Sequence, residues 1–297
     1  MGDLLLLAVA LVWGSSYLAA KTLVVTGGVL VVLALRYLVS TAAMLPLMVR
    51  RRPTRRETGV GVLLGCTQAS VLVLETYGVS LTSATNAGVL ISLTILLTPI
   101  LECAVRRRWL PGRFFLAAGV ATAGVALLVA GPGLRAPSAG DALMLAAAVV
   151  RAAHVTLSGR LARQHDTVTL TTLQLVTGTV VFTVAAGPAL LPTAASFGAT
   201  EWLGVLYLAL GCSVFAFLVQ LWAIRRTSAA RASLLLGTEP VWAVLIGVGV
   251  GGEHLTVLAI AGIALVLAGT FGGRRVERDH RLLASKARTT AAMSAPL

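Results

Sequence analysis

The chain has 297 residues, of which 57% are hydrophobic and 12% are charged, and its mean hydropathy is +0.91. Soluble domains are about 45–50% apolar and about 25% charged, so this sequence has too little polar surface for a water-soluble globule of its size. In a soluble protein the net charge of +13 would indicate nucleic-acid binding, an interpretation that depends on where the basic residues lie.

Ten apolar segments follow one another along the chain, each close to the roughly 20 residues that a membrane-crossing helix needs. They lie at 3–24, 28–48, 58–78, 83–105, 112–131, 139–160, 168–188, 199–222, 231–250 and 255–272. The first segment has no basic region before it and is longer than the apolar core of a signal peptide, so we expect it to be retained. The sequence predicts an all-α integral membrane protein with ten transmembrane helices. Residues 273–297 form a basic tail that we expect to be disordered.

The basic residues have a one-sided distribution in this predicted topology. Twenty of the 24 lysines and arginines fall at 50–56, 106–113, 160–163, 225–231 or beyond 273. If the chain crosses the membrane ten times, all of these stretches lie on the same side. Cytoplasmic loops are enriched in lysine and arginine, so both termini, the tail included, are predicted to be cytoplasmic. The positive charge then indicates topology, with the lipid bilayer and not a nucleic acid as partner.

The sequence also contains a weak internal repeat. Residues 2–3 match 140–141 at an offset of 138; residues 82–84 match 227–229, and Gly124 matches Gly269, at an offset of 145. We therefore expect two five-helix halves, residues 1–131 and 139–272. Because five is odd, the halves must be inverted in the membrane relative to each other. Inverted repeats are a recurring architecture of secondary transporters.

Five short motifs have specific positions within these segments. They are Trp13-Gly14-Ser15-Ser16-Tyr17, Leu35-Arg36-Tyr37, residues 77–87, Glu239-Pro240-Val241-Trp242 and Gly252-Glu253. Together they resemble the drug/metabolite transporter superfamily, in its ten-helix EamA type, over about residues 3–272. The resemblance implies two EamA repeats and transport of small metabolites or drugs, often as efflux, for example of amino acids or related metabolites. The sequence departs from the family in having Pro99 later in its segment than Pro240, and Arg108 where the family often has glutamate.

Ionisable groups at mid-membrane depth cost about 2.5–3.5 kcal/mol each on insertion scales, so they suggest functional sites. We predict a substrate site formed by Trp13, Tyr17, Gln68, Asn86, Arg151, His154 and Glu239. Arg151 either binds an anionic group of the substrate or is the counter-ion of Glu239. The structural alternative is a buried Arg–Glu pair that only joins helices. For Trp13 and Tyr17 the alternative is that they only pack in the bundle. For Gln68 and Asn86 the alternative is that they only join helices.

A second group of residues is predicted to serve gating or structure: Arg36, Glu75, Pro99 and Pro240. Pro240 directly follows Glu239 and should kink its helix, because proline removes a backbone hydrogen bond. Such breaks often lie beside transporter sites. Proton coupling through Glu239 is a hypothesis, and a helix–helix contact is its alternative.

No motif indicates another chemistry. The three cysteines do not pair by spacing, the four histidines are scattered, and there is no Walker A loop, so we predict no metal, no cofactor and no enzyme activity. We expect a secondary transporter that works by alternating access, as a monomer or homodimer, in a bacterial inner (plasma) membrane, since the composition suggests a GC-rich bacterial genome. The alternatives are a membrane-embedded enzyme and a non-transporting membrane sensor.

Overall fold

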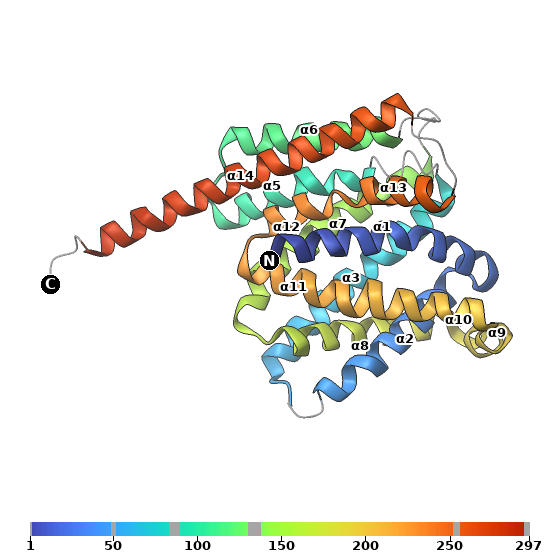
Figure 1. Ribbon diagram of the computed structural model, residues 1–297. Helices are drawn as coiled ribbons and strands as arrows, with labels where there is room; N and C mark the ends of the chain where they lie inside the picture. The colour runs from blue at the N-terminus through green and yellow to red at the C-terminus, as the bar shows by residue number, and fades with distance from the viewer. Residues whose placement is uncertain (1, 49–51, 83–89, 130–137, 252–255, 294–297) are drawn as a thin grey trace.

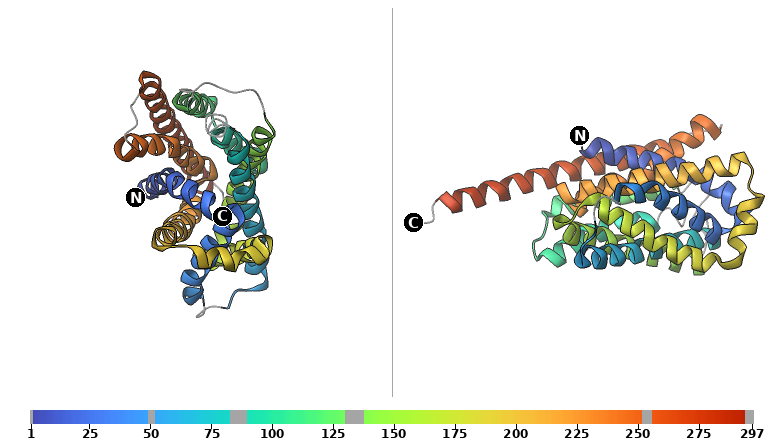
Figure 2. Two further views of the ribbon diagram at one scale, coloured as in Figure 1. Left: turned by 90° about the vertical axis from the view of Figure 1, so that its right-hand side faces the viewer. Right: turned by 90° about the horizontal axis from the view of Figure 1, so that it is seen from below.

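The computed structural model describes residues 2–48, 52–82, 90–129, 138–251 and 256–293. Within these residues the chain is helical and contains no strand. The helices lie side by side with their long axes roughly aligned, and one helix, α14, extends well beyond one end of the bundle (Figure 1). The end-on view in Figure 2 shows that they form a single bundle with no separate domain outside it.

Before residue 130 the described helices are α1 (Gly2–Gly27), α2 (Val29–Met48), α3 (Arg55–Leu81), α5 (Thr94–Arg106) and α6 (Gly112–Val129). After residue 138 the longer helices are α7 (Ala139–Leu161), α8 (Thr167–Ala186), α11 (Ala216–Arg226), α13 (Glu239–Gly251) and α14 (Val257–Met293). Shorter elements complete the second part: η1 (Ala162–Gln164), η2 (Gly187–Ala189), α9 (Leu190–Ser196), α10 (Ala199–Leu206), η3 (Tyr207–Phe215) and α12 (Ala229–Leu236).

The helices have the length and composition of membrane spans. In the described part of the chain seven segments are long and apolar enough to cross a bilayer, and two shorter apolar helices lie at Gly2–Ser16 and Gly112–Leu127. Large apolar side chains point outward, among them Leu116, Val184 and Leu203, which are 70%, 77% and 67% exposed. Only helices and closed barrels satisfy their backbone groups in lipid, so an outward apolar surface on a helical bundle indicates a multi-pass membrane protein.

The connectors rich in arginine meet at one end of the bundle, which we call the basic end. Asp3 at the start of α1 accepts two hydrogen bonds from Arg231, at 2.9 and 2.6 Å, and one from Arg274 at 3.0 Å. Glu277 of α14 lies 3.7 Å from Arg231 and accepts a hydrogen bond from Ser228 at 2.8 Å. These contacts join α1, α12 and α14 at the same end.

The expectation of a disordered tail from residue 273 is wrong for residues 273–293, which continue α14 as a helix. Three ion pairs hold the first part of this extension, residues 274–281. Arg274 and Glu277 lie on one face and are held by α1 and α12, and Glu277 also pairs with Arg281 at 3.3 Å, an i, i+4 spacing that stabilises helices. Residues 294–297 lie outside the described part of the chain.

Positions that the sequence repeat relates either contact each other or make equivalent contacts. The Thr41 and Thr179 hydroxyls, one on α2 and one on α8, lie 2.8 Å apart and are separated by 138 residues. A Cβ added to Gly124 of α6 would lie 2.6 Å from the Val266 nitrogen, and one on Gly269 of α14 would lie 2.5 Å from the Ala117 oxygen. The backbones of α6 and α14 therefore touch through two glycines that the 145-residue offset relates.

Two helices are interrupted at matching positions as well. A turn at Leu93 precedes α5, which begins at Thr94, and a turn at Gly237–Thr238 precedes α13, which begins at Glu239. Thr94 and Glu239 are again 145 residues apart. The kink expected at Pro240 is thus a break just before it, with the proline in the first turn of α13, where its missing N–H costs little.

The contact of α6 with α14 gives a test of the packing. Gly269→Leu should force the two helices apart, and overpacking of this kind costs about 1–3 kcal/mol of folding free energy. We expect a lower melting temperature for the purified protein in detergent. Gly119→Leu on α6 is the matched control, because a Cβ there meets nothing within 4 Å. Equal melting temperatures for the two variants would contradict the contact.

Candidate functional site

Three ionisable side chains from three helices meet inside the bundle, and we call them the central ion cluster. Arg151, near the middle of α7, lies 3.4 Å from a carboxylate oxygen of Glu239 on α13 and 3.6 Å from one of Glu75 on α3. Its guanidinium also lies over the ring of Trp13 on α1, 5.2 Å from the ring centre. The site therefore draws on α1 and α3 from one part of the chain and on α7 and α13 from the other.

The cluster is largely shielded from the surface. The side chains of Arg151, Glu75 and Glu239 are 17%, 19% and 12% exposed. A charge removed from water costs several kcal/mol unless it is paired, so each member depends on the others. Loss of the arginine would leave two carboxylates facing each other, and loss of either carboxylate would leave the arginine with one fewer partner.

The helix break positions Glu239. Because α13 begins at this residue, Glu239 lies in the first turn, where the helix dipole favours a negative charge. A half-helix whose N-terminus points into a membrane bundle is a device that transporters use to hold charged groups. On the other side of the break, α12 ends at Leu236.

A second feature of the site is the π-helical segment η3, in the span that runs from α10 to α11. A π-turn bonds i to i+5 and leaves carbonyl groups available to other donors. The carbonyl oxygen of Cys212 accepts one hydrogen bond from the Trp13 indole at 3.0 Å and another from Arg36 at 3.1 Å. Arg36 also donates to the Ser213 hydroxyl at 2.6 Å, and Ser40 donates to the Ala209 oxygen at 3.1 Å. The segment η3 thus orients Trp13 against the central ion cluster.

His154 lies one turn beyond Arg151 on α7, in a different contact. Its Nδ1 lies 2.8 Å from the Thr67 hydroxyl of α3, and its side chain is buried. Gln68, the next residue on α3, is also buried. These two predicted site residues therefore lie at the α3–α7 contact, beside the cluster and not in it.

The remaining predicted site residues are placed only in part. Pro99 is a buried residue inside α5. Tyr17 lies in α1, but its side chain is outside the described part, and Asn86 lies outside it entirely. Glu75, which the sequence analysis grouped with gating or structural residues, belongs by its position to the central ion cluster.

The EamA-like transporter family matches this chain twice, over residues 1–130 and 138–272. The chain belongs to the EamA-like transporter family. This membership confirms the resemblance drawn from the motifs around Trp13, Arg36 and Glu239.

Two individual proteins similar to this chain are also named as transporters. The chain is 28% identical over 289 residues to "Uncharacterized transporter YetK" of Bacillus subtilis (strain 168), covering 91% of this chain and 86% of that protein. It is 27% identical over 266 residues to an "Uncharacterized transporter" of Archaeoglobus fulgidus, covering 89% and 83%. A solved crystal structure has the same fold, with a TM-score of 0.76 over 94% of this chain and 98% of that one at 18% identity.

In this EamA-family chain the polar contacts around η3 were not predicted from the sequence. The Ser15 and Tyr207 hydroxyls are hydrogen-bonded to each other, and Tyr207 also donates to the Val12 oxygen at 3.1 Å. Ser15 belongs to the motif that begins at Trp13, which was a usable signal. Cys212 and Ser213 gave none, because nothing in their apolar surroundings distinguishes a π-turn from an α-turn.

The contribution of the hydrogen bond from Arg36 to the Ser213 hydroxyl of η3 can be tested by mutation. Ser213→Ala leaves the Nε–H of Arg36 without its buried partner, and an unsatisfied buried donor costs about 1–3 kcal/mol. We expect a lower melting temperature in detergent. Ser196→Ala removes only an exposed local bond to Thr193 and should change little. If Ser213→Ala has the same melting temperature as the wild type, this hydrogen bond does not stabilise the fold.

Proposed function

We propose that the protein is a secondary transporter that moves a small organic solute across the membrane by alternating access. The observation that carries this proposal is the central ion cluster, a charged group inside a membrane bundle that is contacted from both parts of the chain. Charges at such depth are costly and usually mark the path of a substrate or ion. Membership in a transporter family supports the same conclusion.

We propose ten crossings, arranged as two inverted halves at 1–131 and 139–272. The two family matches have nearly these bounds. Further support comes from the Thr41–Thr179 contact, the Gly124–Gly269 pair and the matching helix starts at Thr94 and Glu239. A contact between residues that a repeat relates is what a two-fold axis through that contact would produce.

The proposed orientation of the protein in the membrane follows from the distribution of its arginines. The arginine-rich connectors share the basic end, which the positive-inside rule assigns to the cytoplasm. We therefore propose that both termini are cytoplasmic and that the membrane is the bacterial plasma membrane. Asp3, Arg231, Arg274 and Glu277 would then close the cytoplasmic side of the bundle, since they join α1, α12 and α14 there.

The charges of the cluster suggest the kind of solute. A molecule with both a carboxylate and an amine can replace the internal ion pairs, with its carboxylate on Arg151 and its amine on Glu75 or Glu239. Such an exchange keeps every buried charge paired, which desolvation requires. Amino acids and related metabolites have this chemistry, and export is the direction that we propose from the family. Trp13, Tyr17, Gln68, Asn86 and His154 are proposed to line the same site.

Proton coupling fits the same arrangement. Protonation of Glu239 or Glu75 would remove one of the two negative charges beside Arg151 and free the guanidinium for a solute carboxylate. Arg36, held by η3, and the two prolines are proposed to shape and gate the site without touching the solute. The functional unit is proposed to be a monomer or a homodimer that needs no cofactor.

The proposal is tested in two stages. A thermal-shift screen of amino acids, nucleosides and cationic drugs on purified protein selects a ligand, whose flux is then measured in proteoliposomes. We expect a zwitterionic amino acid to be selected and its flux to respond to an imposed pH gradient. Selection of only nucleosides or cationic drugs would contradict the proposed solute class. Absence of flux for every selected ligand would contradict transport and favour an enzyme or a sensor.

Variants then locate the site. Arg151→Gln should reduce flux at least about tenfold, because it removes the cation proposed to hold the solute carboxylate, and a hydrogen bond to a charged group contributes about 1.5–3 kcal/mol. Arg151→Lys keeps the charge and should retain part of the flux, and membrane abundance shows whether each variant folds. Arg113→Gln, an exposed arginine at the start of α6, is the matched control and should behave as wild type. Normal flux in Arg151→Gln would remove Arg151 from the site.

A further inference from the structure

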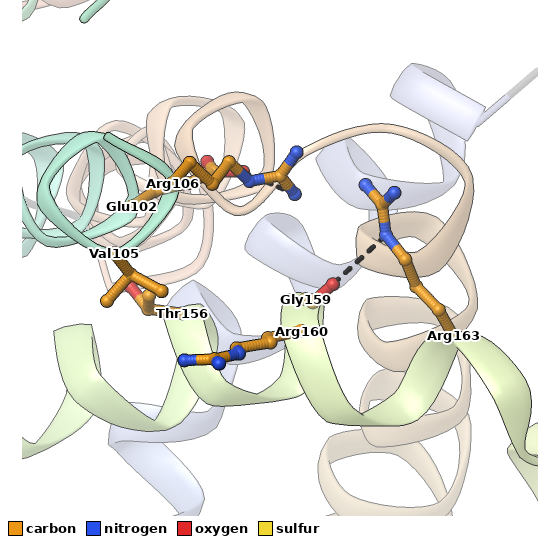
Figure 3. Close-up of a pocket in the computed structure, with 7 residues that line it drawn as sticks. All are labelled: Glu102, Val105, Arg106, Thr156, Gly159, Arg160 and Arg163. Atoms are coloured by element: carbon orange, nitrogen blue, oxygen red, sulfur yellow. Dashed lines mark hydrogen bonds and ion pairs between the residues drawn. The ribbon is translucent and has the colours of Figure 1, made fainter. Parts of the chain in front are cut away.

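A cleft opens at the basic end between α5 and α7, away from the central ion cluster (Figure 3). Its volume is about 240 Å³, and its lining includes Glu102, Val105 and Arg106 of α5 and Thr156 and Arg160 of α7, with Arg163 of η1. Arg160 is nine residues beyond Arg151, which places it about 14 Å further along the helix axis. The cleft is therefore a separate place in the fold, and the proposed transport role does not involve it.

The lining carries three guanidinium groups and one carboxylate. The carboxylate is already engaged, since one oxygen of Glu102 pairs with Arg106 at 3.0 Å and the other accepts from the Ala230 backbone N–H at 2.6 Å. Within the described residues, the Nε of Arg163 donates to the Gly159 oxygen at 3.1 Å, and Arg160 has no ion-pair partner. The cleft thus has an excess of positive charge with guanidinium groups available to a ligand.

Thr156 adds a neutral donor to this set. Its residue is only 7% exposed, and within the described part of the chain its hydroxyl has no hydrogen-bond partner. Buried polar groups are nearly always hydrogen-bonded, because an unpaired one costs free energy. In Figure 3 the Thr156 side chain lies on the α5-facing side of α7, between Val105 and the arginines.

A second hollow extends the positive surface. It has a volume of about 180 Å³ and shares Arg163 with the cleft, and its other lining residues are Trp222, Arg225 and Arg226. Arg226 lies over the ring of Trp222, 4.8 Å from its centre. Arg225 donates hydrogen bonds to the Thr167 hydroxyl and, at 3.3 Å, to the Arg163 carbonyl. The residues that line this second hollow therefore add positive charge next to Arg163.

We propose that the cleft binds a phosphate group, held by Arg160 and Arg163 with the Thr156 hydroxyl as an additional donor. Guanidinium groups bind phosphate through paired, charge-assisted hydrogen bonds, and three arginines against one engaged carboxylate match a group with one or two negative charges. The phosphate belongs either to the headgroup of an anionic lipid or to a small free anion. Trp109 lies just beyond α5 and is 62% exposed, as is common for a residue at headgroup depth. Bound there, the phosphate lies between α5 and α7 and is held from the α7 side.

The test compares the two sources on purified full-length protein in detergent. One arm titrates inorganic phosphate at constant ionic strength with chloride and follows the melting temperature. The other measures retention of phosphatidylglycerol by native mass spectrometry. The site variant is Arg160→Gln with Arg163→Gln, and the control is Arg113→Gln, which removes an exposed arginine at the same end but does not line the cleft.

We expect wild type and Arg113→Gln to bind at least one probe equally, and the site variant to bind it at least about tenfold more weakly, because two charge-assisted contacts are lost. Thr156→Val should weaken binding by a smaller factor, since it removes one neutral donor. Binding of phosphatidylglycerol alone assigns the site to lipid headgroups, and binding of inorganic phosphate assigns it to free anions. If wild type binds neither probe, or if the site variant binds as tightly as Arg113→Gln, the proposal is wrong.

Discussion

The pairing of Arg151 with Glu75 and Glu239 is the constraint on which the rest of the structure depends. Three charges inside an apolar bundle are tolerable only while each has its partners, so α3, α7 and α13 must hold their positions to within a hydrogen-bond length. Trp13 covers the guanidinium from α1, and the indole N–H that fixes this ring is bound to η3. The charged centre therefore depends on contacts from five elements, which are α1, α3, α7, α13 and η3.

Interruptions of regular helix supply what this centre needs. The break before α13 places Glu239 at the positive end of a helix dipole, and the Cys212 carbonyl of the π-helical segment η3 accepts hydrogen bonds from Trp13 and Arg36. In a bilayer such backbone groups are acceptable only where protein satisfies them. Each irregularity therefore has a cost, and each positions a group that contacts the central ion cluster or the Trp13 ring beside it.

The sequence predicted the all-helical membrane architecture, because apolar length indicates directly whether a segment can cross a bilayer; seven described segments qualify as spans, and the number ten stays a prediction. It also predicted Arg151 and Glu239 as a pair among its alternatives, since depth alone makes both residues unusual. It did not predict that Glu75 joins them or that His154 turns instead to Thr67, because hydropathy gives depth but not which faces of separate helices meet. The helical tail was missed for a similar reason: composition suggested disorder, whereas Arg274 and Glu277 are fixed by partners more than 40 residues away in sequence.

The contacts of two repeat-related aspartates, one at each end of the bundle, differ in kind. At the basic end Asp3 and Glu277 are bound by arginines from α12 and α14. Separating α1 from these helices therefore breaks both ion pairs of Asp3 at once. The residue that the repeat relates to Asp3 is Asp141, which accepts a hydrogen bond from the Thr82 hydroxyl and caps α7 with Ser138. The same acidic position thus pairs with arginines at the basic end, and its counterpart in the second half caps a helix and accepts from a threonine hydroxyl. Separating α1 from α12 and α14 at the basic end therefore requires the separation of opposite charges, which costs less where water raises the local dielectric constant.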